Sequence, residues 1–288
     1  MEPIFSSWAG LASHFIGECF DCARPFIDDT YTGLDPLVRF VSAQLFIDCH
    51  LSSESVLLLV QAQKEWDADL ISRAVMEGSL KFAYMLHGNS DEMKAKVEEY
   101  WNLLPQFFAI KRSERVKRVL EDLDNPDDPE WRPFRDIILN PAEIEQVRQR
   151  YPRQQRQMLE ERWSFSGICR TFSQTKDAGL RMFVHLAHGY GMSSHLLHKD
   201  GDGIGMVWER YKRDPEQQAA VKLGHSARVV SDVCTFAKLR LLSLLRACEQ
   251  HRPAELISKI EGRYEALLFA ELAKASRHFT EVEYGAQP

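Results

Sequence analysis

Apolar residues recur at three- and four-residue spacing along most of the chain, which is the period of an α-helix that buries one face. The clearest example runs over residues 66–87 and ends before Gly88. Similar patterns predict further helices over 35–50, 53–64, 91–103, 106–122, 142–160, 163–174, 175–190, 224–250 and 254–278. Pro105 and Pro152 should kink or break helices, because proline lacks the N–H that an interior turn donates.

The same pattern indicates the fold class. No segment alternates convincingly at two-residue spacing, so we predict an all-α multi-helix bundle of roughly ten helices without a substantial sheet. In the last third of the chain, an apolar stripe is formed by Val233, Phe236, Leu239 and Leu242. Pro253 separates that helix from the next one, which predicts an antiparallel pair that closes the core or forms the interface of a homodimer.

One acidic, proline-containing segment, residues 121–131, is the predicted domain boundary. We expect it to link an N-terminal helical layer, residues 1–120, to a C-terminal layer, residues 132–288, with both layers packed as one domain. Basic residues concentrate on either side of it, over 111–118 and 148–156. Such runs form either a phosphate-binding face or, more commonly, solvated helix faces.

Composition narrows the class of protein. The chain has 288 residues, 44% of them hydrophobic and 27% charged, so it can bury a substantial core. Its net charge of -6 argues against a non-specific nucleic-acid coat, which needs a basic surface. The N-terminal residues do not resemble a signal peptide, and no window has the roughly 20 apolar residues of a membrane span. We therefore expect a cytoplasmic protein without a membrane partner.

The six cysteines fit that expectation. Four are scattered singly in apolar helical patterns, where a free thiol packs as a small hydrophobe: Cys49, Cys169, Cys234 and Cys248. Cys19 and Cys22 form a C-x2-C pair that follows His14. A structural zinc site needs four ligands and usually a second such pair, which the sequence lacks. We predict no cofactor.

Chemistry-bearing residues concentrate between Arg181 and His198, where four of the ten histidines lie. On a helix, one stripe would contain Arg181, His185 and His188, and a second would contain Tyr190, Ser194 and His198. Glycines 189 and 191 separate the stripes, and a glycine-rich loop follows. The segment therefore predicts a polar pocket near a helix end.

Three chemistries suit this segment. Metal binding would use histidines 185, 188, 195 and 198 with aspartates 177, 200 and 202, but no diagnostic metal motif is present and we assign no metal ligands. Nucleophilic catalysis by Ser194 with His198 lacks the strained turn that usually carries such a serine. Metal-independent RNA cleavage needs an arginine to stabilise the phosphorane charge and a histidine to transfer the proton.

The segment from Arg181 to His188 resembles the R-x4-6-H motif of the HEPN superfamily, all-α proteins many of which are ribonucleases of bacterial conflict systems. The resemblance implies an endoribonuclease in which Arg181 stabilises charge and His188 acts as acid or base, with RNA as partner and a homodimer as assembly. His198, on the second stripe, is a further candidate catalytic residue.

A wider resemblance covers residues 35–200. Arg73-x3-Glu77, Tyr84, Trp163 and Tyr190-x3-Ser194-x3-His198 together resemble the bacterial all-α family catalogued as domain of unknown function 5677. This resemblance implies a binding site in which Arg73 and Glu77 face Tyr190, Ser194 and His198. The alternative is a structural network that fixes helix packing, because buried polar groups must find partners. The protein would then be a non-catalytic interaction or sensor module.

Overall fold

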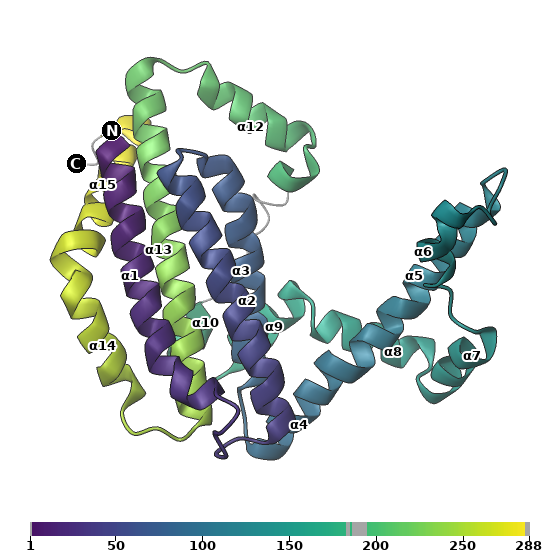
Figure 1. The fold of residues 1–288 in the computed structure, drawn as a ribbon. Coiled ribbons are helices and arrows are strands. Elements are labelled where there is room, and N and C mark those ends of the chain that lie inside the picture. The colour runs from purple at the N-terminus through teal and green to yellow at the C-terminus, as the bar shows by residue number, and fades with distance from the viewer. Residues whose placement is uncertain (1, 183–184, 186–194, 286–288) are drawn as a thin grey trace.

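The computed structural model describes residues 2–182, 185 and 195–285, and the regular elements in these ranges are all helices. The predicted all-α bundle is therefore confirmed. No strand occurs within those ranges. The long helices lie side by side, and a narrower helical arm projects from them (Figure 1).

Four long helices form the centre of the bundle: α1 (Glu2–Ile27), α2 (Pro36–Gln61), α3 (Glu65–Met85) and α13 (Pro215–Ala247). Helix α13 packs against both α1 and α3, so helices from the two ends of the chain share one core. Helix α14 (Pro253–Tyr264), a π-helical segment η4 (Glu265–Phe269) and α15 (Ala270–Tyr284) pack along α13 and α1. The N- and C-terminal parts therefore interleave (Figure 1).

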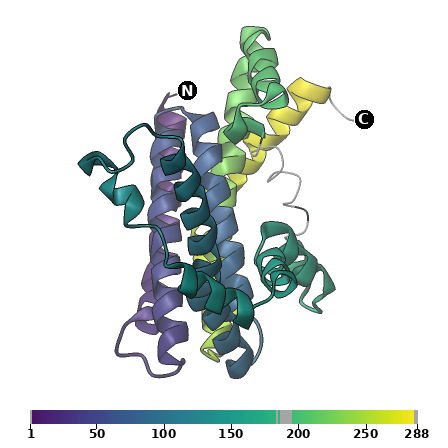
Figure 2. The ribbon, with the colours of Figure 1, turned by 90° about the vertical axis from the view of Figure 1, so that its right-hand side faces the viewer.

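The arm consists of residues that leave the bundle and return. Helix α4 (Ser90–Glu98), the π-helical segment η1 (Glu99–Leu103) and α5 (Leu104–Glu121) lead outward. The return path contains η2 (Pro129–Trp131), α6 (Arg132–Arg135), α7 (Pro141–Arg150), α8 (Arg153–Arg162) and α9 (Phe165–Gln174). The acidic segment 121–131 lies where the chain turns back at the end of the arm (Figures 1 and 2).

The two basic runs lie on this arm. Lys111 on α5 pairs with Glu160 on α8 at 2.5 Å, and Arg148 on α7 pairs with Glu114 on α5. Both pairs join the outward and return paths of the arm. Part of the basic charge is thus used in contacts across the arm, as expected of solvated helix faces.

Prolines and capping side chains mark where most of the helices begin. Pro152 is the N-cap of α8 and separates it from α7, so the predicted interruption there is confirmed. At Pro105 the helix does not break: the chain passes directly from the π-helical segment into α5, with Pro105 in its first turn. The predicted division of 35–50 from 53–64 is wrong, because α2 is continuous. The Ser53 hydroxyl donates to the Cys49 carbonyl at 2.7 Å within the helix and does not end it.

Helix α2 is long and apolar enough to cross a membrane by length and composition alone. A third of its most apolar window is buried within the fold. A core helix of a soluble bundle passes the same test, so the composition of α2 does not by itself indicate a membrane span.

Candidate functional site

The predicted histidine-rich segment is only partly described by the structure. Arg181 lies in α10 (Ala178–Met182) with an exposed side chain, and His198 is exposed in a short helical stretch, residues 195–198. His188, Tyr190 and Ser194 lie outside the described residues. Because the side chain of His198 is exposed, it is not part of a buried network that fixes helix packing.

The metal alternative can be assessed for the described part of this segment. His195 Nδ1 lies 2.8 Å from an oxygen of Asp200, and both side chains are more than two-fifths exposed. Asp177 instead pairs with Arg246 at 2.5 Å. Within residues 2–182, 185 and 195–285, no three histidine, cysteine or acidic side chains are placed to hold a metal ion.

Arg73 and Glu77 lie one turn apart on α3, as predicted, and both are half-buried. Glu77 accepts a hydrogen bond from Lys81 at 2.6 Å, and neither Arg73 nor Glu77 is without a partner. Asp69 precedes them by one further turn, so a polar stripe with four-residue spacing runs along α3. The N-terminal end of this stripe enters the pocket described below.

Two other residues of the predicted series meet each other. The rings of Tyr84 on α3 and Trp163, at the end of α8, form an edge-to-face contact with centroids 5.0 Å apart. The indole N–H of Trp163 donates to Glu99 at 2.9 Å. Both aromatic side chains are buried, so this pair anchors the return path of the arm to the bundle.

A pocket of about 430 Å³ lies between α3, α12 (Gly201–Tyr211), α13 and α15. Its polar lining includes Asp69 from α3, Arg210 from α12, and His225 and Arg228 from α13. Apolar walls are supplied by Leu196, Met206, Val221 and Phe279. Pockets of this size and composition are typical of small-molecule sites.

The polar lining is centred on Asp69, which is 5% exposed. The guanidinium of Arg228 donates to Asp69 at 2.7 Å and to Asp232 at 2.9 Å. His225 Nε2 lies 3.7 Å from the second oxygen of Asp69. Burial of Asp69 opposes its ionisation, but the neighbouring His225 ring and the charge of Arg228 outweigh it and lower the pKa to about 2.

His225 is 8% exposed, and its ring meets the indole of Trp66 edge to face at 4.6 Å. Neither ring nitrogen has a hydrogen-bond partner among the described residues. Burial lowers the pKa of His225, so the ring is neutral at pH 7. A neutral imidazole that lines a pocket can both donate and accept a hydrogen bond.

Arg210 supplies the second guanidinium of the pocket. It stacks over Trp66 at 5.4 Å from the ring centroid. Within the part of the chain that the structure describes, no carboxylate lies within salt-bridge distance of Arg210. Burial, aided by the charge of Arg213, lowers the pKa of Arg210. Glu283 and Glu209, which are paired with Arg213, offset part of this effect. Arg210 therefore lines the pocket as a cation without an ion pair of its own among the described residues.

Helix α15 completes the pocket with hydroxyl groups at four-residue spacing, those of Ser276, Thr280 and Tyr284. The position of α15 depends on Gly224 of α13, where a Cβ atom would lie 2.6 Å from the Cβ of Phe279. Because glycine has no side chain, the two helices can approach this closely.

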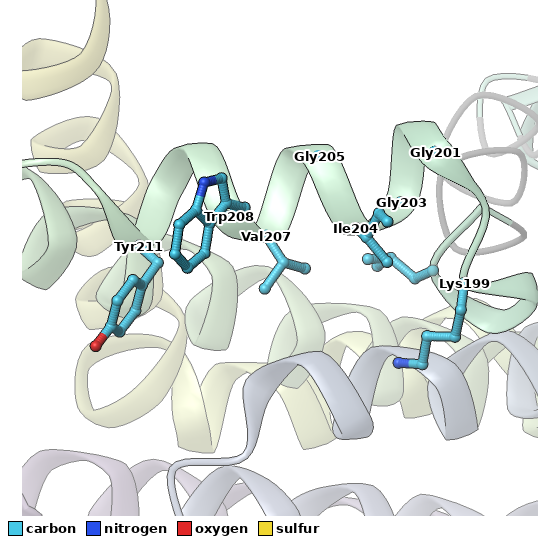
Figure 3. A pocket seen from close by; sticks show the side chains of 9 residues that line it. Lys199, Gly201, Gly203, Ile204, Gly205, Val207, Trp208 and Tyr211 are labelled. Carbon is cyan, nitrogen blue, oxygen red and sulfur yellow. The ribbon is translucent and has the colours of Figure 1, made fainter.

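A second hollow, of about 760 Å³, lies along one face of α12, and the described residues that line it lie between Leu196 and Tyr211. Lys199, Val207 and Tyr211 extend from this face in the same general direction (Figure 3). Among the described lining residues Lys199 alone is charged, so this part of the lining offers fewer ionic groups than the His225 pocket.

The sequence contains a signal for this pocket that the predictions did not use. His225, Arg228 and Asp232 lie at i, i+3 and i+7 on α13, and Asp69 extends the Arg73–Glu77 stripe by one turn. Asp69 and His225 are buried, and buried polar groups need partners, which these residues find across α3 and α13.

Two families were predicted from resemblance, HEPN and domain of unknown function 5677, and both resemblances remain predictions. Comparisons of this chain with protein-family models, with curated proteins and with solved structures find no match.

Proposed function

We propose that the protein binds a small organic anion in the pocket between α3, α12, α13 and α15. The observation that carries this proposal is Arg210, a half-buried guanidinium that lines the pocket without a carboxylate at salt-bridge distance in the described ranges. A guanidinium pairs well with phosphate or carboxylate groups, because its donors match two oxygens at once.

The remaining lining supports the same class of ligand. Its charged side chains are Arg210, Arg228 and Asp69, and because Arg228 is already paired with Asp69 and Asp232, the charge left for a ligand is that of Arg210. The His225 imidazole and the hydroxyls of α15 can hydrogen-bond further ligand oxygens. The apolar walls suit the carbon part of a ligand, which inorganic phosphate lacks. The protein would act as a binding or sensor module.

The test uses the full chain and three probes: inorganic phosphate, a nucleoside monophosphate and benzoate. We expect at least one organic anion to bind in isothermal titration calorimetry and to raise the melting temperature. Replacing Arg210 by glutamine should weaken that binding by about tenfold or more, because a hydrogen bond to a charged group contributes about 1.5–3 kcal/mol.

Lys212→Gln is the matched control, since Lys212 lies just after α12 but does not line the pocket. It should bind the probe as tightly as the natural chain. The proposal is wrong if none of the three probes binds, or if Arg210→Gln binds as tightly as Lys212→Gln.

Metal-independent RNA cleavage is the second candidate function. It rests on the R-x4-6-H resemblance and on one observation: the Arg181 side chain is exposed and forms no salt bridge within the described ranges, so it is available to a phosphate. In this proposal Arg181 stabilises the developing charge, and His188 transfers the proton.

Purified protein incubated with RNA in the presence of a chelator tests this second candidate. We expect cleavage by the natural chain, and a loss of about 100-fold or more in rate for Arg181→Ala and for His188→Ala, the usual contribution of such groups. His251→Ala, an exposed histidine outside the motif, is the control and should cleave normally. RNA that stays intact with the natural chain would rule this candidate out.

A further inference from the structure

Helix α2 exposes a row of large apolar side chains on the side opposite its buried face. Phe40 is 52% exposed, Ile47 40%, Leu51 58% and Leu58 65%. At 100° per residue these four side chains fall within an arc of about 40° and extend over about 27 Å. We call this row, together with Gln44 and Glu54, the α2 stripe. An apolar row of this length on one exposed face indicates an interaction surface.

The spacing of the α2 stripe identifies the kind of partner. Positions 40, 44, 47, 51, 54 and 58 alternate steps of four and three residues, which is the heptad pattern of a two-stranded coiled coil. Positions 40, 47, 51 and 58 are apolar, whereas positions 44 and 54 are polar, Gln44 and Glu54. A single helix from another chain would cover such a stripe.

The order of apolar and polar positions in the α2 stripe is the same when it is followed in either direction from residue 49. An antiparallel copy of α2 would place Phe40 opposite Leu58, Ile47 opposite Leu51, and Gln44 opposite Glu54. Every apolar position then meets an apolar position, and the amide of Gln44 can donate to the carboxylate of Glu54. A surface that complements itself in this way is what a two-fold interface requires.

Other occupants fit less well. A parallel copy would place Glu54 opposite Glu54, which puts two carboxylates together. An antiparallel copy shifted by one heptad would place Leu51 opposite Glu54. An anionic lipid surface would meet the acidic side chains Asp48 and Glu54 on or beside the stripe, where basic residues would be needed.

The surroundings of the stripe leave space for a second helix. A groove of about 500 Å³ lies between α2 and η1, lined in part by Ile47, Leu51 and Trp101. Trp101 also meets Phe40 edge to face at 5.7 Å, which extends the apolar surface onto the base of the arm. Leu58 of a second copy, opposite Phe40, would lie beside this aromatic pair.

We propose that two copies of the chain associate through the α2 stripe, antiparallel, about a two-fold axis near residue 49. This inference is independent of the pocket and of its ligand. The two copies would contribute identical surfaces, so the association ends at the dimer.

Sedimentation equilibrium of the full chain over a range of concentrations measures the association. We expect a dimer for the natural chain and a monomer for Leu51→Lys, because a lysine would be buried opposite Ile47. Leu267→Lys is the control, since Leu267 is 62% exposed on η4, away from α2. Circular dichroism shows whether both variants keep the fold.

Two substitutions at Gln44 test the antiparallel arrangement. Gln44→Lys would face Glu54 of the other copy and should tighten the dimer by about threefold, whereas Gln44→Glu should weaken it similarly, given two such pairs per dimer. In a parallel dimer position 44 faces itself, so both substitutions would weaken association. The proposal is overturned by a chain that stays monomeric at all concentrations, by a dimer that Leu51→Lys leaves intact, or by equal weakening from both Gln44 variants.

Discussion

At the scale of single residues, Arg240 is the least expected feature of the core. This α13 side chain is 1% exposed, and its Nη1 donates to the Ser79 hydroxyl at 2.6 Å. The guanidinium lies over the Phe46 ring at 5.6 Å, and its Nε has no hydrogen-bond partner among the described residues. Burial lowers the pKa of Arg240, and within the described ranges no carboxylate forms a salt bridge with its guanidinium.

We predict that Arg240→Met stabilises the protein by about 1–3 kcal/mol, because replacing a poorly paired buried charge by an apolar side chain of similar length removes a desolvation cost. Ser79 would keep its hydrogen bond to the Val75 carbonyl, at 2.6 Å, so no polar group is left without a partner. Arg240→Ala should instead destabilise by about 2–5 kcal/mol, as cavity-forming substitutions do. Urea unfolding measures both changes, and a Met variant less stable than the natural chain would contradict this account.

Residue spacing predicted some neighbours and not others. It placed Arg73 and Glu77 on one face of α3, where they are found. The contact between the rings of Tyr84 and Trp163 was not predicted, although both residues belong to the series on which the wider family resemblance rests. Residue spacing also did not identify Asp69 as a neighbour of His225 and Arg228, because Asp69 precedes them by more than 150 residues and meets them only once α3 packs on α13. Spacing within a helix fixes faces, whereas packing fixes which faces meet.

At the scale of elements, capping residues and prolines fix where many helices begin. Asp214 accepts hydrogen bonds from the first turn of α13, and Pro215 follows it, so the helix begins nine residues before the predicted start at 224. The arm begins at α4 and runs outward through the π-helical turn at Glu99–Leu103 into α5. A hydrophobic pattern carries no signal for such a turn, so the arm was not predictable from it.

At the scale of the whole molecule, the bundle holds three histidines in a largely neutral state. Burial is the main cause that lowers the pKa of His50, His87 and His225. His195, which is exposed beside Asp200, has a raised pKa instead. A histidine buried as the neutral form binds its proton more readily in the unfolded chain, whose pKa is about 6.5. These three residues therefore stabilise the fold above that pH, and the contribution is lost as the pH falls.

We accordingly predict that the three buried histidines lower the free energy of unfolding, measured in urea, as the pH falls from 7 to 5. His225→Gln should reduce this decrease, because it removes the most deeply buried of the three titrating rings. Two groups around His225 keep their ionisation in this range, since Asp69 has a pKa of about 2 and Arg228 stays charged. Asp232, which is paired with Arg228, acts in the opposite direction: burial raises its pKa to about 6, so the folded chain takes up a proton there and gains stability as the pH falls. Comparison of the variant with the natural chain isolates His225, because Asp232 is present in both. Asp69 makes the stability depend on pH in a separate, more acidic range. Its pKa is lowered from 3.8, so roughly 2 kcal/mol should be lost as the pH falls from about 4 to about 2. A His225→Gln chain whose free energy of unfolding changes between pH 7 and pH 5 as much as that of the natural chain would show that His225 does not contribute to the change. The change would then come from His50, His87 and Asp232.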